Sequence, residues 1–163
     1  MGREMRYSTP AAVCLLLLLS PAVQAEVRPG DQGLGLVAGS PIGLTYKYWY
    51  SRTMAVDAGL GAIGGNFAFY ATHLWHDFSL LPKPASWDGQ LPFYFGVGTR
   101  VRFTSDPRFG VRTIVGTSFI HSRKPFEIFG ELGPFIRLTP DVGVSIDGGV
   151  GFRYYFKSLV PSS

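Results

Sequence analysis

Short stretches in which apolar and polar residues alternate constrain the fold of this chain more than any other feature. Eight such stretches follow one another, at residues 32–39, 43–50, 54–63, 67–78, 91–103, 109–120, 125–138 and 142–156. Segments rich in Gly, Pro, Asn, Asp and Ser separate most of them. Successive side chains of a strand point to opposite faces, so a period of two predicts strands rather than helices. We therefore expect an all-β chain.

The two faces of these strands differ sharply in character. One face is bulky and apolar, with Tyr70, Leu74 and Phe78 contributed by the fourth stretch, and His76 is its only ionisable side chain. The other face is polar and is interrupted by glycines such as Gly59 and Gly96. It carries Lys47, Asp57, His73, Asp77, Arg100, Arg102, Arg112, Glu127, Glu131, Arg137, Asp147 and Arg153.

The number of stretches suggests which face points inward. Eight is the smallest common number of strands in an outer-membrane barrel, and its interior is just wide enough for side chains. Glycines among the polar residues suit such a crowded lumen, and aromatic residues near strand ends, such as Tyr50 and Phe103, suit a membrane interface. We expect an eight-stranded antiparallel up-and-down transmembrane β-barrel with its charges inside. A soluble lipocalin-like periplasmic barrel is the alternative.

The first 25 residues have the features of a cleaved secretory signal. Arg3 and Arg6 precede an apolar core at residues 11–19, and Ala22-Val23-Gln24-Ala25 supplies small residues at the cleavage site. The apolar run is shorter than the roughly 20 residues that a membrane-spanning helix needs. We therefore expect cleavage after Ala25 and a single domain over residues 26–163.

Composition argues against several classes of function. The basic residues are spread singly, and the mature chain would carry a charge of +3, which does not suggest a nucleic-acid surface. The only cysteine is Cys14, within the predicted signal, so the mature chain has neither disulfides nor thiolate metal ligands. No cofactor motif is present: the Gly-Leu-Gly segments at 33–35 and 59–61 lack the following helix and lysine of a phosphate loop.

Two groups of residues have the types found in active sites. His73 and Asp77 share a strand face, but four residues along a strand separate them by roughly 13 Å, too far to bind one ion. His121, Ser122 and Glu127 have the residue types of lipid A deacylases. Adjacent strand residues point to opposite faces, so His121 and Ser122 do not form a nucleophile–base pair. We assign no catalytic, cofactor or metal residue.

The inward charges are nearly balanced, with six positive and five negative residues if histidine is neutral. Such a set predicts a lumen closed by salt bridges rather than an open pore. Centring the hairpin of the second and third strands on Arg52 pairs Lys47 with Asp57, and neighbours in this register lie about 5 Å apart. We expect these two residues to form an ion pair.

Connection lengths bear on the topology. With both termini periplasmic, the outward connections after strands one, three, five and seven are all very short, whereas the longest, Ser79 to Gln90, faces the periplasm. This reverses the usual pattern. Either the strand count is off by one or the barrel has almost no extracellular loops.

The end of the chain resembles the terminal signature of outer-membrane barrels. Val150, Phe152, Tyr154 and Phe156 place apolar residues at alternate positions and end on an aromatic, although the tail Lys157 to Ser163 follows. Residues 39–49, 55–61, 73–77, 109–112 and 151–156 extend the resemblance to the small, functionally uncharacterised outer-membrane barrels of bacteria. The resemblance implies a location in the outer membrane, contact with its lipids, and recognition by the barrel-assembly machinery during insertion. It implies no reaction.

These observations lead to one expected function and its alternatives. We expect an integral outer-membrane barrel with a structural or interaction role and without enzymatic activity. A lipid-modifying enzyme, a narrow channel and the soluble binding barrel remain open.

Overall fold

The computed structural model describes residues 27–156. The predicted signal at residues 1–25 and the tail at 157–163 lie outside the described residues. Within residues 27–156 no helix is long and apolar enough to cross a membrane.

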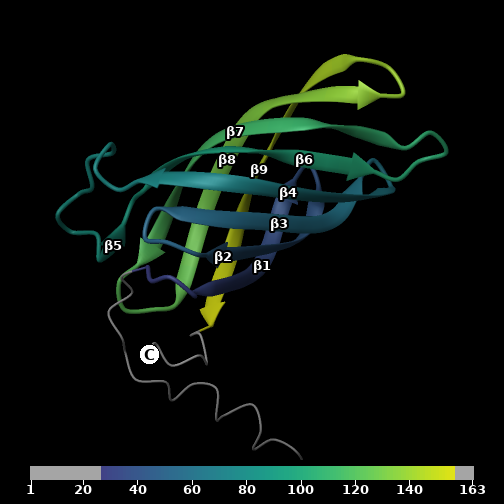
Figure 1. Cartoon of the computed structure of the whole chain (residues 1–163). Coiled ribbons are helices and arrows are strands. Elements are labelled where there is room, and N and C mark those ends of the chain that lie inside the picture. Colours follow the sequence, from purple (N-terminus) through teal and green to yellow (C-terminus); the bar gives the residue numbers. More distant parts are fainter. Residues whose placement is uncertain (1–26, 157–163) are drawn as a thin grey trace, which may run out of the picture.

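Eight long strands of the described chain close into one antiparallel barrel (Figure 1). Each pairs with its neighbour in sequence, and pairing of β1 with β9 closes the circle. A short additional strand, β5, pairs with the end of β7. The strands are β1 (Gln32–Gly39), β2 (Ile42–Trp49), β3 (Met54–Ile63), β4 (Asn66–Asp77), β5 (Gly89–Gln90), β6 (Phe93–Arg102), β7 (Arg108–His121), β8 (Phe126–Thr139) and β9 (Gly143–Phe156).

The predicted strand count is confirmed, and each predicted stretch agrees with its strand to within two residues. Four short turns, at residues 40–41, 64–65, 103–107 and 140–142, connect strands at one end of the barrel. We call this the turn end. The opposite end holds both ends of the described chain and the long connection at residues 78–92 (Figure 1). We call it the terminus end.

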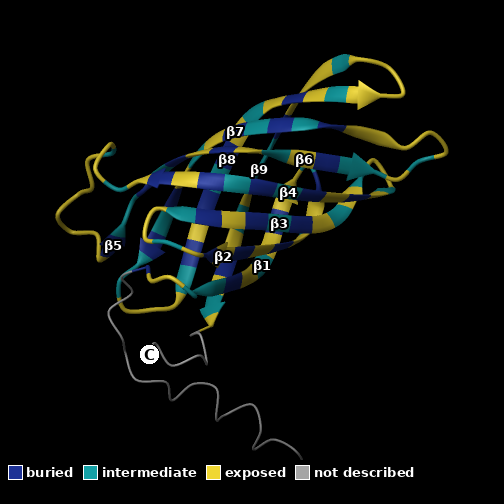
Figure 2. Ribbon diagram, viewed as in Figure 1, coloured by how far each residue is buried: buried dark blue, intermediate teal, exposed yellow. Residues whose placement is uncertain are grey.

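Burial alternates along the strands (Figure 2), and the exposed, outer face is the apolar one. In the described residues, thirty large hydrophobic side chains are exposed, whereas the buried core contains only twelve hydrophobic residues. The polar face, in contrast, is buried: Lys47, Glu127, Arg153 and five further charged residues are almost inaccessible. The protein is therefore polar inside and apolar outside.

The predicted facing of β4 is wrong. His73 and Asp77 point outward instead of into the lumen, whereas Tyr70, Leu74 and His76 are buried inside. The turn after β3 explains the error, because it contains only Gly64 and Gly65 and pairs Ile63 with Asn66. A two-residue turn places even-numbered residues of β4 beside odd-numbered residues of β3. Residues on the face of Asp57 are consequently Thr72 and Leu74, not His73.

Candidate functional site

The most distinctive feature of the molecule is its charged interior. The described residues include four buried cations and four buried anions inside the barrel: Lys47, Arg100, Arg112, Arg153, Asp57, Glu127, Glu131 and Asp147. Each belongs to a salt bridge. Burying an unpaired charge costs several kcal/mol, so a barrel with this interior requires matched signs.

Glu127 on β8 is the hub of a first cluster near the terminus end. Its Oε1 accepts a hydrogen bond from Nζ of Lys47 at 2.9 Å, and its Oε2 accepts from the Tyr155 hydroxyl at 2.7 Å. Arg153 Nη1 lies 3.2 Å from the same Oε2. Both Lys47 and Glu127 side chains are completely buried. Because β2 and β8 are not neighbours, the Lys47 bridge crosses the lumen.

Arg153 joins this hub to Asp57. Its Nη2 donates to Asp57 Oδ2, and both Nη2 and Nε donate to Oγ1 of Thr45, at 2.8 and 3.1 Å. The guanidinium also lies over the Phe129 ring, 3.7 Å from its centroid. One arginine thus connects two carboxylates and a hydroxyl from three different strands.

A second cluster lies towards the turn end. Arg112 Nη2 donates to Glu131 at 2.8 Å, while its Nε lies 3.3 Å from Asp147 Oδ2. Arg100 Nη1 donates to the other oxygen of Asp147 at 2.7 Å. The Tyr94 hydroxyl donates to Glu131 at 3.0 Å. Two arginines therefore share two carboxylates.

Aromatic residues fill the space between the clusters. Tyr70 donates to Thr45 of the first cluster at 3.3 Å, and its ring lies under the Arg112 guanidinium of the second, 4.3 Å from the centroid. Lys47 Nζ lies 4.4 Å from the Trp49 ring centroid and 5.4 Å from that of Tyr94. Side chains rather than open space occupy the middle of the barrel.

The predicted Lys47–Asp57 register is confirmed, because these residues are cross-strand partners. Their predicted ion pair is wrong: Lys47 binds Glu127 and Asp57 binds Arg153. Both charges find closer partners across the lumen than along the ladder.

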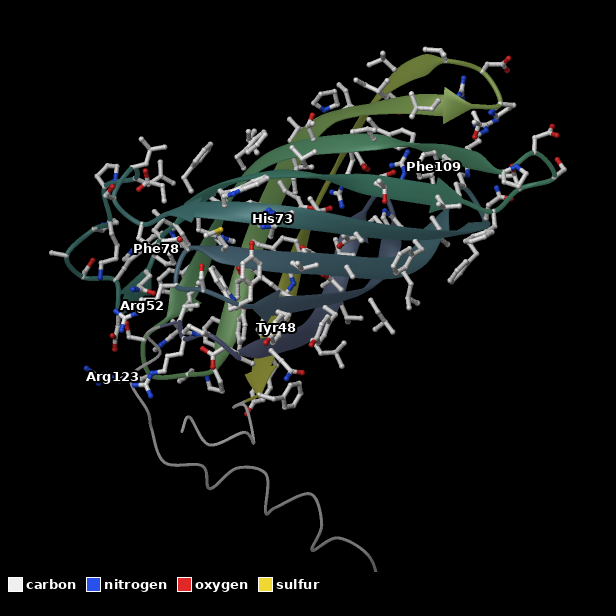
Figure 3. All side chains as sticks on the ribbon, in the orientation of Figure 1. Tyr48, Arg52, His73, Phe78, Phe109 and Arg123 are labelled. Atoms are coloured by element: carbon white, nitrogen blue, oxygen red, sulfur yellow. The ribbon has the colours of Figure 1, made fainter. Side chains whose placement is uncertain are left out.

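Two predicted lumen residues, His73 and Asp77, lie on the outer surface, and two others, Arg102 and Arg137, lie at the mouth of the lumen without joining either cluster. His73 lies on the outer face, where Tyr50 contacts its Nε2 and Trp75 packs edge-on against its ring. Asp77 is exposed and accepts hydrogen bonds from Ser79 and Leu80. Arg102 and Arg137 line a cavity at the turn end, outside both clusters. Figure 3 labels His73 on the outer surface of β4.

The interior also contains aromatic residues that are absent from the predicted polar face. Trp49 is fully buried and donates to the Tyr155 hydroxyl at 3.0 Å, which in turn binds Glu127. Side chains two positions apart on a strand point to the same face. Trp49 follows Lys47 by two positions and Tyr155 follows Arg153 by two, so the alternation predicts that both aromatic side chains point inward. Tyr94 is six positions from Arg100 on β6, so the same rule predicts that its side chain points inward.

The structure separates the residues of the candidate active sites. The His121 ring accepts from the backbone N–H groups of Arg123 and Lys124, at the terminus end. Glu127 lies inside the lumen, where it forms salt bridges with Lys47 and Arg153. The terminal residues Val150, Phe152, Tyr154 and Phe156 all lie exposed on the outer face of β9.

No protein-family model matches this chain, and neither a curated protein nor a solved structure is significantly similar to it. No group of three or more His, Cys, Asp or Glu residues in the described part is arranged to hold a metal ion.

Proposed function

We propose that this chain is an integral outer-membrane β-barrel that spans the bilayer, has a structural or interaction role, and does not conduct solutes. The observation that carries this proposal is the inverted distribution of residues, with matched charges inside and large apolar side chains on every side. Soluble monomers rarely expose contiguous apolar patches of more than a few hundred square ångströms. Lipid tails would cover such a surface.

Aromatic residues support the same orientation. Exposed aromatics gather near the terminus end at Tyr48, Tyr50, Trp75, Phe95, Tyr154 and Phe156, and near the turn end at Phe67, Phe69, Phe103 and Phe109. Aliphatic residues such as Val97, Val115 and Leu132 lie between these groups. Two aromatic girdles flanking an apolar band are typical of outer-membrane barrels. Figure 3 labels one member of each, Tyr48 and Phe109.

The dimensions also suit a bilayer. A tilted transmembrane strand needs about 9–11 residues. Six of the eight barrel strands contain 10–14 residues, and β1 and β2 contain eight each. A backbone hydrogen bond continues the pairing of β1 and β2 at the terminus end, where the Gly30 N–H donates to the Trp49 carbonyl at 2.6 Å.

The packed lumen favours a structural or interaction role over transport. Ion pairs and aromatic rings of the two clusters occupy the barrel's width, and an eight-stranded interior leaves little room beyond its side chains. A lipid-modifying enzyme would need a nucleophile, a base and an acid near one rim. His121 and Glu127 do not meet in that way, which favours a non-catalytic role.

Cell fractionation tests this proposal. The full chain, expressed in a Gram-negative host, is expected in the outer-membrane fraction, with faster gel mobility before heating than after it. Recovery in the soluble periplasmic fraction, with a mobility that heating does not change, would contradict it and favour a soluble binding barrel.

A further inference from the structure

At the turn end, arginines surround a cavity of about 300 Å³. Arg100 and Arg102 come from β6, Arg108 from β7 and Arg137 from β8. Strand β9, which pairs with β8, completes the lining with residues 143–146. The Arg100–Asp147–Arg112 bridge forms part of the second lumen cluster, so the cavity ends on packed side chains.

Most of this positive charge has no internal counter-charge. Arg100 is paired with Asp147 at 2.7 Å. Among residues 27–156, no carboxylate lies within salt-bridge distance of Arg102, Arg108 or Arg137. Arg137 donates only to a backbone oxygen, that of Asp141, at 2.8 Å. The cavity therefore carries three unneutralised cations, in contrast to the balanced interior below it.

Two of these guanidinium groups lie against glycines, Gly64 in the β3–β4 turn and Gly143 at the start of β9. A Cβ atom at Gly64 would lie 3.1 Å from Arg102 Nη2, and one at Gly143 would lie 2.9 Å from Arg137 Nη2. Gly64 also has a φ of +53°, which favours glycine. The Nε of Arg102 is buried and has no hydrogen-bond partner. The two glycines thus leave room for the Arg102 and Arg137 guanidinium groups, and the Arg102 Nε–H remains a buried donor without an acceptor.

Three like charges around one small cavity repel one another, and a multivalent anion would relieve this repulsion. A guanidinium matches the oxygens of phosphate in bidentate geometry. A phosphate dianion would neutralise two of the three charges, and a carboxylate only one. Since a water molecule occupies about 30 Å³ of liquid, a cavity of about 300 Å³ exceeds a lone phosphate and accommodates an attached polyol or sugar.

We propose that this cavity is a binding site for a phosphomonoester, with Arg102, Arg108 and Arg137 as its ligands. The phosphate belongs either to a soluble ester or to the headgroup of a lipid. Because the arginines belong to the barrel mouth, the site does not depend on membrane insertion and extends beyond the function proposed above.

Isothermal titration of the full chain refolded in uncharged detergent tests the site, with inorganic phosphate, glycerol 3-phosphate and acetate as probes. Glycerol 3-phosphate should bind at least tenfold more tightly than acetate. The triple variant Arg102→Gln/Arg108→Gln/Arg137→Gln should lose at least tenfold in affinity. Arg108→Gln alone, at an exposed position, should lose about threefold even if the triple variant does not fold.

A matched control removes three cations from the terminus end: Arg28→Gln/Arg123→Gln/Lys124→Gln. Its affinity for glycerol 3-phosphate should stay within twofold of the wild type. Absence of phosphate binding, equal affinity for acetate, or an equal loss in the control would overturn the proposal.

A second arm distinguishes the source of the phosphate. Phosphatidylcholine nanodiscs are prepared with either phosphatidic acid or phosphatidylglycerol, in amounts that carry equal charge. If a lipid headgroup occupies the site, glycerol 3-phosphate should bind at least tenfold more weakly in the nanodiscs with phosphatidic acid. Equal binding in both nanodiscs would assign the site to a soluble ester.

Discussion

Replacing Glu127 by glutamine should be among the most destabilising isosteric changes in this barrel. The Lys47 Nζ and Glu127 Oε1 atoms lie 2.9 Å apart, with both side chains fully buried. At an effective dielectric constant of about 20, the attraction of two such charges is about 6 kcal/mol. Desolvation offsets part of it, and loss of one member of a buried pair costs about 3–5 kcal/mol. Glu127→Gln should lower the unfolding free energy by that amount.

A double-mutant cycle isolates the pair. Lys47→Met combined with Glu127→Gln should be less destabilising than the sum of the single changes, with a coupling of about 2 kcal/mol. The control cycle uses Lys47→Met with Asp57→Asn, because Asp57 is the ladder neighbour of Lys47 but binds Arg153. Its coupling should be clearly smaller. Urea-induced unfolding from lipid vesicles, followed by tryptophan fluorescence, measures both. Additivity in the first cycle, or equal coupling in the two, would refute the assigned partners.

Three further predictions concern the surface, the packing and the lumen. Val97→Arg, midway along β6, should lower the free energy of unfolding in vesicles by about 2–4 kcal/mol. Val142→Arg, in the β8–β9 turn, should lower it much less. Equal losses of stability in urea titrations would argue against a lipid-facing belt. Gly35→Ala should lower the free energy of unfolding by about 1–3 kcal/mol, because the added Cβ would lie 1.8 Å from the Phe152 carbonyl oxygen. At Gly130 an added Cβ would have only Val150 nearby, at 3.8 Å, so Gly130→Ala should be nearly neutral in the same assay. In planar bilayers the unmodified protein should give no steady single-channel currents, and reproducible conductance steps would show that the lumen is open.

Strand positions were predictable from the sequence because the alternation and the turn residues are local signals. The β2–β3 register followed from the same information, since a hairpin centred on Arg52 pairs Lys47 with Asp57. The alternation predicts the wrong inward face for β4, because the predicted stretches end at Ile63 and begin at Phe67, which implies a connection of three residues. Asn66 in fact begins the strand, and one residue of difference exchanges the two faces.

The ion pairs and the arginine cavity were less accessible to sequence reasoning. Lys47 and Glu127 are 80 residues apart on strands that are not neighbours, so closure of the barrel decides their contact. The cavity at the turn end likewise combines residues of several strands and turns, and Arg108 lies at the first position of its strand. Whether residues at strand ends meet in one cavity depends on the stagger between neighbouring strands, and the alternation of apolar and polar residues does not determine that stagger.

Depth-dependent quenching tests the central claim, that the apolar outer face is embedded in lipid. Cys14 is the only cysteine of the chain, so Cys14→Ser permits labelling at single introduced cysteines. An environment-sensitive fluorophore at Val97→Cys should emit at shorter wavelength and be quenched by brominated acyl chains when the protein is refolded into vesicles. The same fluorophore at Val142→Cys should be quenched by aqueous iodide instead. Quenching of both labels by iodide alone would contradict the membrane-spanning barrel.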